Sequence, residues 1–352
     1  MIKIGRIGLK YWCGVFFALP LLLTACSGGD GSDEFPQKSR VVGFSGDIPL
    51  SRVATVYAAT GDVDKIGVFA YFGSGNFDAS TAKPNFMYNQ CVNKQADNTW
   101  TYTPEKYWPN NNTDKISFFA YAPYVDESVT PNPYFNGNTV SGFPILNYTV
   151  PKSTSNQVDL LVATPVMNQS SGSVNFKLHH TLTKVVIYVK SKDNTTGKTV
   201  TSFTLIGRKS GTLTYHASTS AADEGWQWNN LSSSTKQTFT AAITNFPIPD
   251  TAAEEKKVLV TFYMLPAGEG SLFNVTYQYA TTDSSGSTVT QVIKLENQTL
   301  PDTDKWVPGG NIGYTINVGK KTISVSQENG PTSWDDDPTE ETVTGTEDSS
   351  GS

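Results

Sequence analysis

The sequence has only three cysteines in 352 residues: Cys13, Cys26 and Cys91. Cys13 falls in an N-terminal leader and Cys26 at its end, so Cys91 has no partner left in the mature chain. A small disulfide-stapled domain is therefore excluded, and we expect the fold to be stabilised by burial of apolar side chains.

Charge is also scarce, because only 16% of the residues are charged and histidine occurs three times. The net charge of −6 arises mainly from an acidic C-terminal end, whereas the stretch Arg40 to Thr332 is balanced. A balanced body offers no electrostatic surface for nucleic acid. His179 and His180 are neighbours, which point to opposite faces of a strand, and His216 is distant in sequence. We therefore predict no metal site.

Signatures of catalysis are missing as well. The chain has no Gly-x-Ser-x-Gly elbow and no distinctive order of serine, histidine and aspartate. Pairs of carboxylates occur in any chain with this many acids, and no motif singles out one pair for glycoside hydrolysis. We predict no catalytic residue and no cofactor, and do not expect an enzyme.

The first 26 residues predict a secreted lipoprotein. The apolar stretch 15–23 follows three basic residues and leads into Leu-Thr-Ala-Cys, which is similar to a bacterial lipobox. This stretch is shorter than the 18 residues of a membrane-spanning helix. We expect residues 1–25 to be a signal peptide, Cys26 to be the lipid attachment site, and residues 26–39 to be a flexible acidic tether. The basic residues are Lys3, Arg6 and Lys10.

Alternation of apolar and polar residues recurs along the body and predicts an all-β fold. Val42, Phe44, Ile48 and Leu50 share one parity, as on a half-buried strand. Pro49 cannot donate to a β-ladder, so this strand should be an edge strand or be interrupted there.

Two further stretches carry specific expectations. Residues 312–325 alternate on both sides of Gly319-Lys320-Lys321, which predicts a hairpin. Residues 258–265 are apolar on both parities except at Thr261, which predicts a central strand with both faces covered.

Polar segments divide the body. The Gly/Ser-rich run at residues 168–173 predicts a boundary between an N-terminal sandwich, residues 40–170, and a C-terminal sandwich, residues 171–334. Residues 335–352 predict a disordered acidic tail.

A set of motifs lies along the body at residues 67–71, 85–90, 100–109, 116–123, 159–163, 176–180 and 310–325. In this order and spacing they resemble the fimbrillin family, the pilins and pilin-like lipoproteins of Bacteroidetes type V pili. The resemblance covers about Val41 to Trp334. It implies two tandem transthyretin-like Greek-key β-sandwich domains, surface exposure at the cell outer membrane, and assembly into fimbriae that act in adhesion.

The resemblance also implies an assembly route. In polymerising members, an arginine-specific protease cuts after the first strand, and a strand from another subunit fills the vacated groove. Arg52 directly follows the alternating strand and is the predicted maturation site, with Arg40 as the alternative. An exposed loop residue without such a role is the other reading of Arg52. The displaceable strand would contribute Val42, Phe44, Ile48 and Leu50.

The C-terminal end departs from the pattern of a stalk pilin. A donor strand should alternate apolar and polar residues, but the acidic tail offers a single Val343. This favours a tip or accessory subunit that accepts a strand without donating one. A donor from residues 321–326 remains an alternative.

Aromatic residues support a second hypothesis, a non-polymerising glycan-binding lipoprotein. Trp226 and Trp228 would share one face of a strand, and Tyr102, Tyr107 and Trp108 cluster near a proline. Such rings stack on sugars, although sandwiches also bury aromatic side chains in their cores. Both hypotheses stay open from the sequence.

Overall fold

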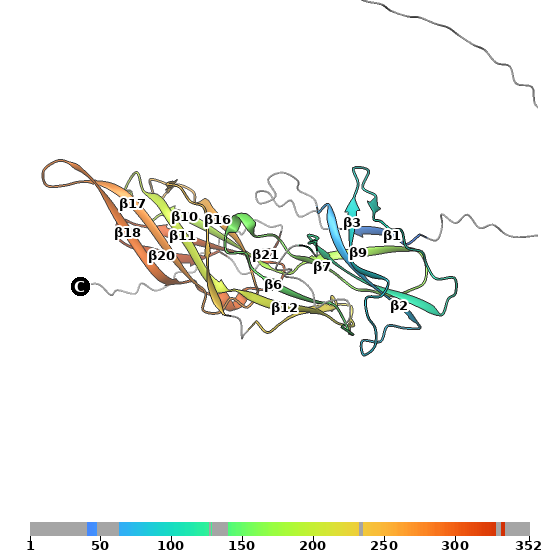
Figure 1. The fold of residues 1–352 in the computed structure, drawn as a ribbon. Coiled ribbons are helices and arrows are strands. Elements are labelled where there is room, and N and C mark those ends of the chain that lie inside the picture. The colour runs from blue at the N-terminus through green and yellow to red at the C-terminus, as the bar shows by residue number, and fades with distance from the viewer. Residues whose placement is uncertain are drawn as a thin grey trace, which may run out of the picture. The chain divides into compact units, whose positions relative to one another are not determined.

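The computed structural model describes residues 41–47, 63–126, 128, 140–231, 235–328 and 332–334. These residues belong to one compact unit, residues 40–352, and they form strands with two short 3-10 helices, η2 (Thr154–Asn156) and η3 (Thr303–Lys305) (Figure 1). Within these ranges, no helix has the length and apolar character needed to cross a membrane. The predicted all-β fold is confirmed.

The first sheet has the strand order β1-β9-β7-β5-β2-β3-β4, and β8 pairs with β5. Alternate residues of β2 and β5 enter different hydrophobic clusters, so both faces of these central strands are covered. Val68 and Phe118 lie in the cluster that the curved sheet encloses, whereas Phe69 and Phe119 lie in the larger cluster on its other face. The strands are β1 (Gly43–Asp47), β2 (Lys65–Ser74), β3 (Met87–Lys94), β4 (Trp100–Thr101), β5 (Asp114–Ala122), β7 (Leu161–Ala163), β8 (Val166–Gln169) and β9 (Ser173–His180).

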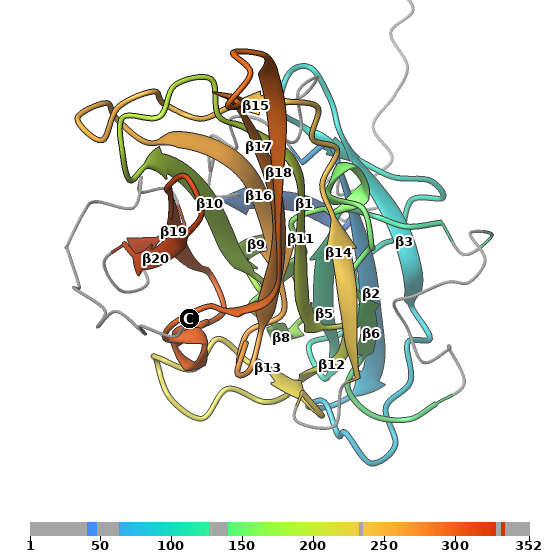
Figure 2. The same cartoon turned by 90° about the vertical axis from the view of Figure 1, so that its left-hand side faces the viewer.

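Two further sheets contribute to the larger hydrophobic cluster (Figure 2). One has the order β16-β10-β19-β20, with β21 also paired to β19. The other has the order β14-β11-β17-β18, with β15 also paired to β11. The strands are β10 (Thr183–Ser191), β11 (Thr199–Arg208), β14 (Lys236–Thr240), β15 (Phe246–Pro247), β16 (Lys257–Met264), β17 (Leu272–Thr282), β18 (Thr288–Thr299), β19 (Gly310–Val318), β20 (Ile323–Gln327) and β21 (Thr332–Ser333).

A small sheet of order β13-β12-β6 joins the two halves of the chain. It consists of β6 (Ile145–Thr149), β12 (Ser210–Tyr215) and β13 (Trp226–Asn229). The rings of Phe119 and Tyr215 pack edge to face with centroids 5.3 Å apart, and the Tyr215 hydroxyl donates to the Ala120 carbonyl at 2.6 Å. The larger hydrophobic cluster therefore runs through both halves.

The predicted division into domains at residues 170/171 stays a prediction. Tandem sandwiches agree with the several sheets and with the fold of a solved fimbrial protein. However, β9 pairs with β1 and β7 in the first sheet. A boundary that respects the sheets would therefore follow His180 rather than precede Val174.

The two specific strand predictions have different outcomes. The hairpin is confirmed, because β19 and β20 pair antiparallel over five residue pairs. The central strand is wrong: β16 lies at the edge of its sheet and pairs only with β10 among the described strands. Val258 at its start is 53% exposed, and the later apolar residues are covered in another way: Phe262 faces the core, while Trp334 stacks on Tyr263 with centroids 5.4 Å apart.

Candidate functional site

β1 is an edge strand held mainly by one neighbour. It runs parallel to β9 over five residue pairs, at the end of the strand order (Figure 1). On its other side, the described residues supply one bridge between Val41 and Tyr107, and the Val42 N–H donates to the Lys106 carbonyl at 2.8 Å. β1 therefore has a continuous ladder along one side only.

The inward face of β1 fills an apolar slot. Val42 is fully buried, and Phe44 is 7% exposed. The Phe44 ring packs edge to face on Tyr102 at 5.2 Å and on Phe118 at 5.9 Å, and it stacks on Phe176 at 5.7 Å, all between centroids. We term these three rings the aromatic pocket. Burial of Val42 and Phe44 contributes roughly 1.5–3 kcal/mol each to holding β1.

Hydrogen bonds connect the aromatic residues that line the slot to β1 and to the start of β9. The Tyr102 hydroxyl donates to the Val42 carbonyl at 2.8 Å. The indole Nε1 of the buried Trp108 donates to the Gly172 carbonyl at 3.0 Å, just before β9 begins. The segment after β4 is thus fastened to both β1 and the start of β9.

Burial raises the pKa of the Tyr102 phenol above its ordinary value, and the charges of Glu105 and Tyr107 add to the rise, although the Lys106 amide opposes it. The unfolded chain ionises first, at about pH 10, so the stability from Tyr102 is fully present below that pH and is lost as the pH rises through the folded-state pKa. We expect Tyr102→Phe to lower the unfolding free energy by about 1 kcal/mol at pH 8. Urea unfolding of both proteins over a range of pH should show this difference shrinking as the pH rises above about 10. A difference that stays constant with pH would contradict the assignment.

The structure brings together two of the four residues predicted for the displaceable strand. Val42, directly before β1, and Phe44, on β1, belong to the same buried cluster. Five further predicted site residues lie outside the described residues: Cys26, Arg40, Ile48, Leu50 and Arg52.

Trp226 and Trp228 lie on β13 and pack against the larger hydrophobic cluster. Both side chains are partly buried, and the Trp228 Nε1 donates to the Thr181 carbonyl at 2.7 Å. The Trp226 ring lies 6.4 Å from the ring of His179, between centroids. This packing leaves only part of each ring for a ligand, and the glycan platform at this pair stays a prediction.

The aromatic cluster near Pro109 divides between the slot and its rim. Tyr102 and Trp108 belong to the wall of the slot, whereas Tyr107 is 52% exposed beside the start of β1. Sequence reasoning did not connect the first two with β1, because they come from an irregular segment more than fifty residues away. The only sequence signal was their position within a family motif.

Arg208 is fixed within the fold by several contacts. Its Nη2 forms an ion pair with Glu269 at 2.8 Å, and its Nε and Nη1 donate to the carbonyls of Ala267 and Leu231. The side chain is 13% exposed and lies at the end of β11. A protease could not reach this arginine without opening the sheet.

Each of the three histidines has a different carboxylate neighbour. His180 Nδ1 lies 2.6 Å from Asp159, His179 Nδ1 lies 2.9 Å from Glu224, and His216 Nε2 lies 3.6 Å from an aspartate. In the part of the chain that the structure describes, no group of three or more potential ligands is positioned to hold a metal.

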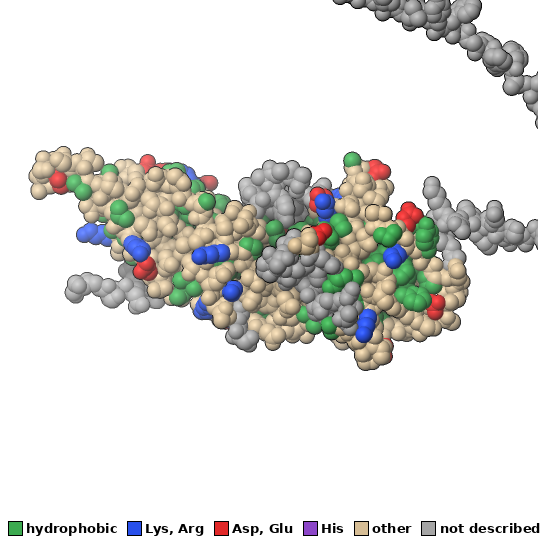
Figure 3. Space-filling view, in the orientation of Figure 1, with side chains coloured by type: hydrophobic (Ala, Val, Ile, Leu, Met, Phe, Trp, Pro, Cys, Tyr) green, Lys and Arg blue, Asp and Glu red, His purple; other side chains and the backbone are tan. Residues whose placement is uncertain are grey.

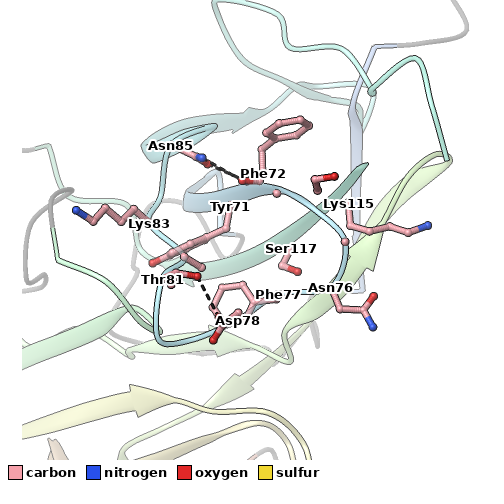
Figure 4. Close-up of a pocket in the computed structure, with 14 residues that line it drawn as sticks. Tyr71, Phe72, Asn76, Phe77, Asp78, Thr81, Lys83, Asn85, Lys115 and Ser117 are labelled. Carbon is pink, nitrogen blue, oxygen red and sulfur yellow. Dashed lines mark hydrogen bonds between the residues drawn. The ribbon is translucent and has the colours of Figure 1, made fainter. Parts of the chain in front are cut away.

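A polar pocket of about 470 Å³ lies beside the end of β2 (Figure 4). The Asn85 side chain accepts from the Phe72 N–H at 2.8 Å and donates to the Phe72 carbonyl at 3.0 Å. Asp78 accepts hydrogen bonds from Ser80 and Thr81, which lower the pKa of its carboxyl. The Phe72 ring is 40% exposed at the rim of the pocket.

On the face shown in Figure 3, charged side chains are scattered among uncharged ones.

The C-terminal segment is anchored at Trp334, which is 2% exposed. Its ring is stacked between those of His180, at 4.4 Å, and Tyr263, at 5.4 Å, between centroids. The Lys184 Nζ donates to the Trp334 carbonyl at 3.3 Å. Because β20 and β21 both pair with β19, the described part of this segment is held at several points.

Comparison with known proteins gives concordant matches. A family model described as "Fimbrillin-like" matches residues 51–330, which leaves β1 just outside the matched range. The chain is 28% identical over 185 residues to a protein of Phocaeicola vulgatus named "Fimbrium subunit Fim1C", and this match covers 47% of each chain. The matched part thus spans about half the length of that relative. A crystal structure of a fimbrial protein from Bacteroides vulgatus superposes with a TM-score of 0.64 at 22% identity, covering 84% of this chain and 99% of the other.

Proposed function

The chain belongs to the fimbrillin-like family, and we propose that it is a fimbrial subunit or pilin-like surface lipoprotein that assembles by protease-triggered strand exchange and acts in adhesion. Its partners are other pilin subunits, which contribute an added strand. The names of the relatives, a fimbrium subunit and a fimbrial protein, support a location at the cell surface or in a fimbrium.

The position of β1 is the observation that carries this proposal. Among the described strands, β1 has a continuous ladder on one side only, so removing it leaves the order of the remaining strands unchanged. Its departure would expose the main-chain groups of β9 and the apolar slot of Val42 and Phe44. An edge with unpaired main-chain groups beside an apolar trough is what an added strand needs.

The distribution of arginines supports selective processing. Arg40 precedes β1 and Arg52 follows it, so a cut at Arg52 severs β1 from the body, whereas a cut at Arg40 removes only the tether. Arg208 is fixed by its hydrogen bonds within the fold. An arginine-specific protease would then act at the N-terminal end alone.

The N-terminal segment supplies the anchor in this scheme. Cys26 carries the lipid that holds the precursor at the outer membrane, and residues 26–39 are the tether. After cleavage at Arg52, β1 leaves together with the lipid, and the body enters the fimbrium. The match to the lipobox pattern supports this assignment.

A tip or accessory position fits the C-terminal end better than a stalk position. The last described strands pair with β19, and Trp334 is locked between two rings. The sequence after Trp334 lacks an alternating apolar stretch. The subunit would accept a strand without donating its own.

Limited digestion with an arginine-specific protease tests the processing step. We expect one stable product that begins at Val53, identified by N-terminal sequencing and intact mass. The Arg52→Lys variant should lose this product, and any product that begins at Val41 would report cutting at Arg40. Arg208→Lys is the matched control and should not change the pattern. Resistance of the folded wild-type protein at both Arg40 and Arg52 would refute protease-triggered exchange.

Glycan binding by a non-polymerising outer-membrane lipoprotein is the rival function. The exposed Phe72 ring beside the polar pocket is the observation that favours it, because sugars stack on exposed aromatic rings. Binding of the intact protein on a glycan array, together with no processing at Arg52, would favour this rival.

A further inference from the structure

We propose that the β1 slot selects donor strands by an aliphatic residue followed two positions later by an aromatic ring, in a strand that runs parallel to β9. We further propose that this donor belongs to a different polypeptide and is not the C-terminal end of a second copy of this chain. The inference rests on the proposed strand exchange and specifies the partner of that site.

The aromatic pocket sets the first requirement. The Phe44 ring lies within 6 Å, between centroids, of the rings of Tyr102, Phe118 and Phe176. These three residues come from distant parts of the sequence. A smaller side chain at this position would leave a cavity among large, fixed rings, because Phe118 and Phe176 are themselves 0–1% exposed. A donor that lacks an aromatic ring here forfeits most of the packing energy of the slot.

Val42 sets the spacing. It is fully buried two residues before Phe44, on the same side of the strand. A residue two positions from the aromatic ring returns to the same face, so the donor must carry a small apolar side chain at that position. The residues between and after them have weaker requirements, since Gly43 has no side chain and Ser45 is exposed.

Main-chain contacts set the direction. The parallel ladder pairs β1 with residues 173–177 of β9. The Val42 N–H and carbonyl also bond to the Lys106 carbonyl and the Tyr102 hydroxyl, each at 2.8 Å. A strand inserted in the opposite direction would exchange the positions of donors and acceptors and lose this pair of contacts.

The chain's own C-terminal end does not meet these requirements. Residues 335–352 contain no aromatic residue and one valine, Val343. The segment 321–326 places Ile323 and Val325 two apart but has no ring, and its strand β20 already pairs with β19. A second copy could therefore not supply the aromatic anchor from its C-terminal end, which points to a partner with a different sequence.

Competition between peptides tests the inference on the full chain after cutting at Arg52. The probe is a fluorescent peptide of residues 41–52, monitored by anisotropy, and the uncut protein, whose slot is occupied, is the negative control. Unlabelled competitors are the same peptide, its Phe44→Ala form, its Ser45→Ala form, its reversed sequence, and a peptide of residues 335–352. The substitutions lie in the peptides, so the folding of the protein does not change between measurements.

The expected order is specific. The native peptide and its Ser45→Ala form should compete equally, and Phe44→Ala should weaken competition by about a hundredfold or more. The reversed and C-terminal peptides should not compete. Equal competition by the Phe44→Ala or reversed peptide would overturn the selectivity while strand exchange stands. Competition by the C-terminal peptide would instead identify a second copy as the donor. If the native peptide itself does not bind, the proposed strand exchange fails.

Discussion

Replacing Phe44 by alanine should lower the free energy of unfolding of the uncut protein by about 3–5 kcal/mol. The ring is 7% exposed, and its truncation leaves a cavity that Tyr102, Phe118 and Phe176 must line. These rings are packed on other neighbours and cannot fully collapse into the space. Chemical denaturation followed by tryptophan fluorescence measures the loss.

Ser45→Ala is the matched control for Phe44→Ala. Its exposed side chain lies on the opposite face of β1, so its effect should stay within about 0.5 kcal/mol. Phe44→Ala should also speed hydrogen exchange in β1 and β9 more than in β10 and β19, since β1 pairs with β9. An effect of Phe44→Ala as small as that of Ser45→Ala would mean that the aromatic pocket does not hold β1.

The sequence predicts local features of this site well. Strict alternation identified Val42 and Phe44 as partners on one face, because successive side chains of a strand alternate by geometry alone. The hairpin of β19 and β20 was also predictable, since its turn lies between two alternating runs. Both features depend on neighbours that are close in sequence.

Features that depend on distant segments could not be predicted in the same way. The apolar pattern of residues 258–265 is compatible with two structures: a central strand, or an edge strand whose outer face is covered by another segment. The second is found, because Trp334 covers Tyr263 on the edge strand β16. The wall of the β1 slot is a similar case. Tyr102 and Phe176 come from distant segments and both contact Phe44, and alternation does not reveal which segments become neighbours.

The pairing of β9 shows why a polar run is an uncertain guide to domain limits. Residues 168–173 have the composition of a linker, yet β9 begins at Ser173 and pairs with β1 and β7. Its sequence neighbour β10 begins only three residues after β9 ends and belongs to a different sheet. Composition marks the turn before β9, but hydrogen bonding decides the sheet to which the strand belongs.

Replacing Trp334 by alanine should lower the free energy of unfolding by about 3–5 kcal/mol. The indole is buried between His180 and Tyr263, and its removal opens a gap between two parallel rings. Trp334→Phe is the matched control, because it keeps a ring in the stack. The indole Nε1 has no hydrogen-bond partner among the described residues, so phenylalanine loses no such bond. Urea unfolding of the three proteins should rank them wild type, Trp334→Phe and Trp334→Ala.

Loss of the Trp334 stack should also loosen the end of the chain without producing a polymer. Exchange should speed in the amides of β20 and β21, because their outer end is no longer held. The released segment would still offer Ile323 and Val325 with no ring, so it should not enter the slot of another copy cut at Arg52. Light scattering of the cut Trp334→Ala protein should therefore show no fibres. Fibres from this variant alone would mean that Trp334 is what prevents donation, and that the protein is a stalk subunit held in an inactive form.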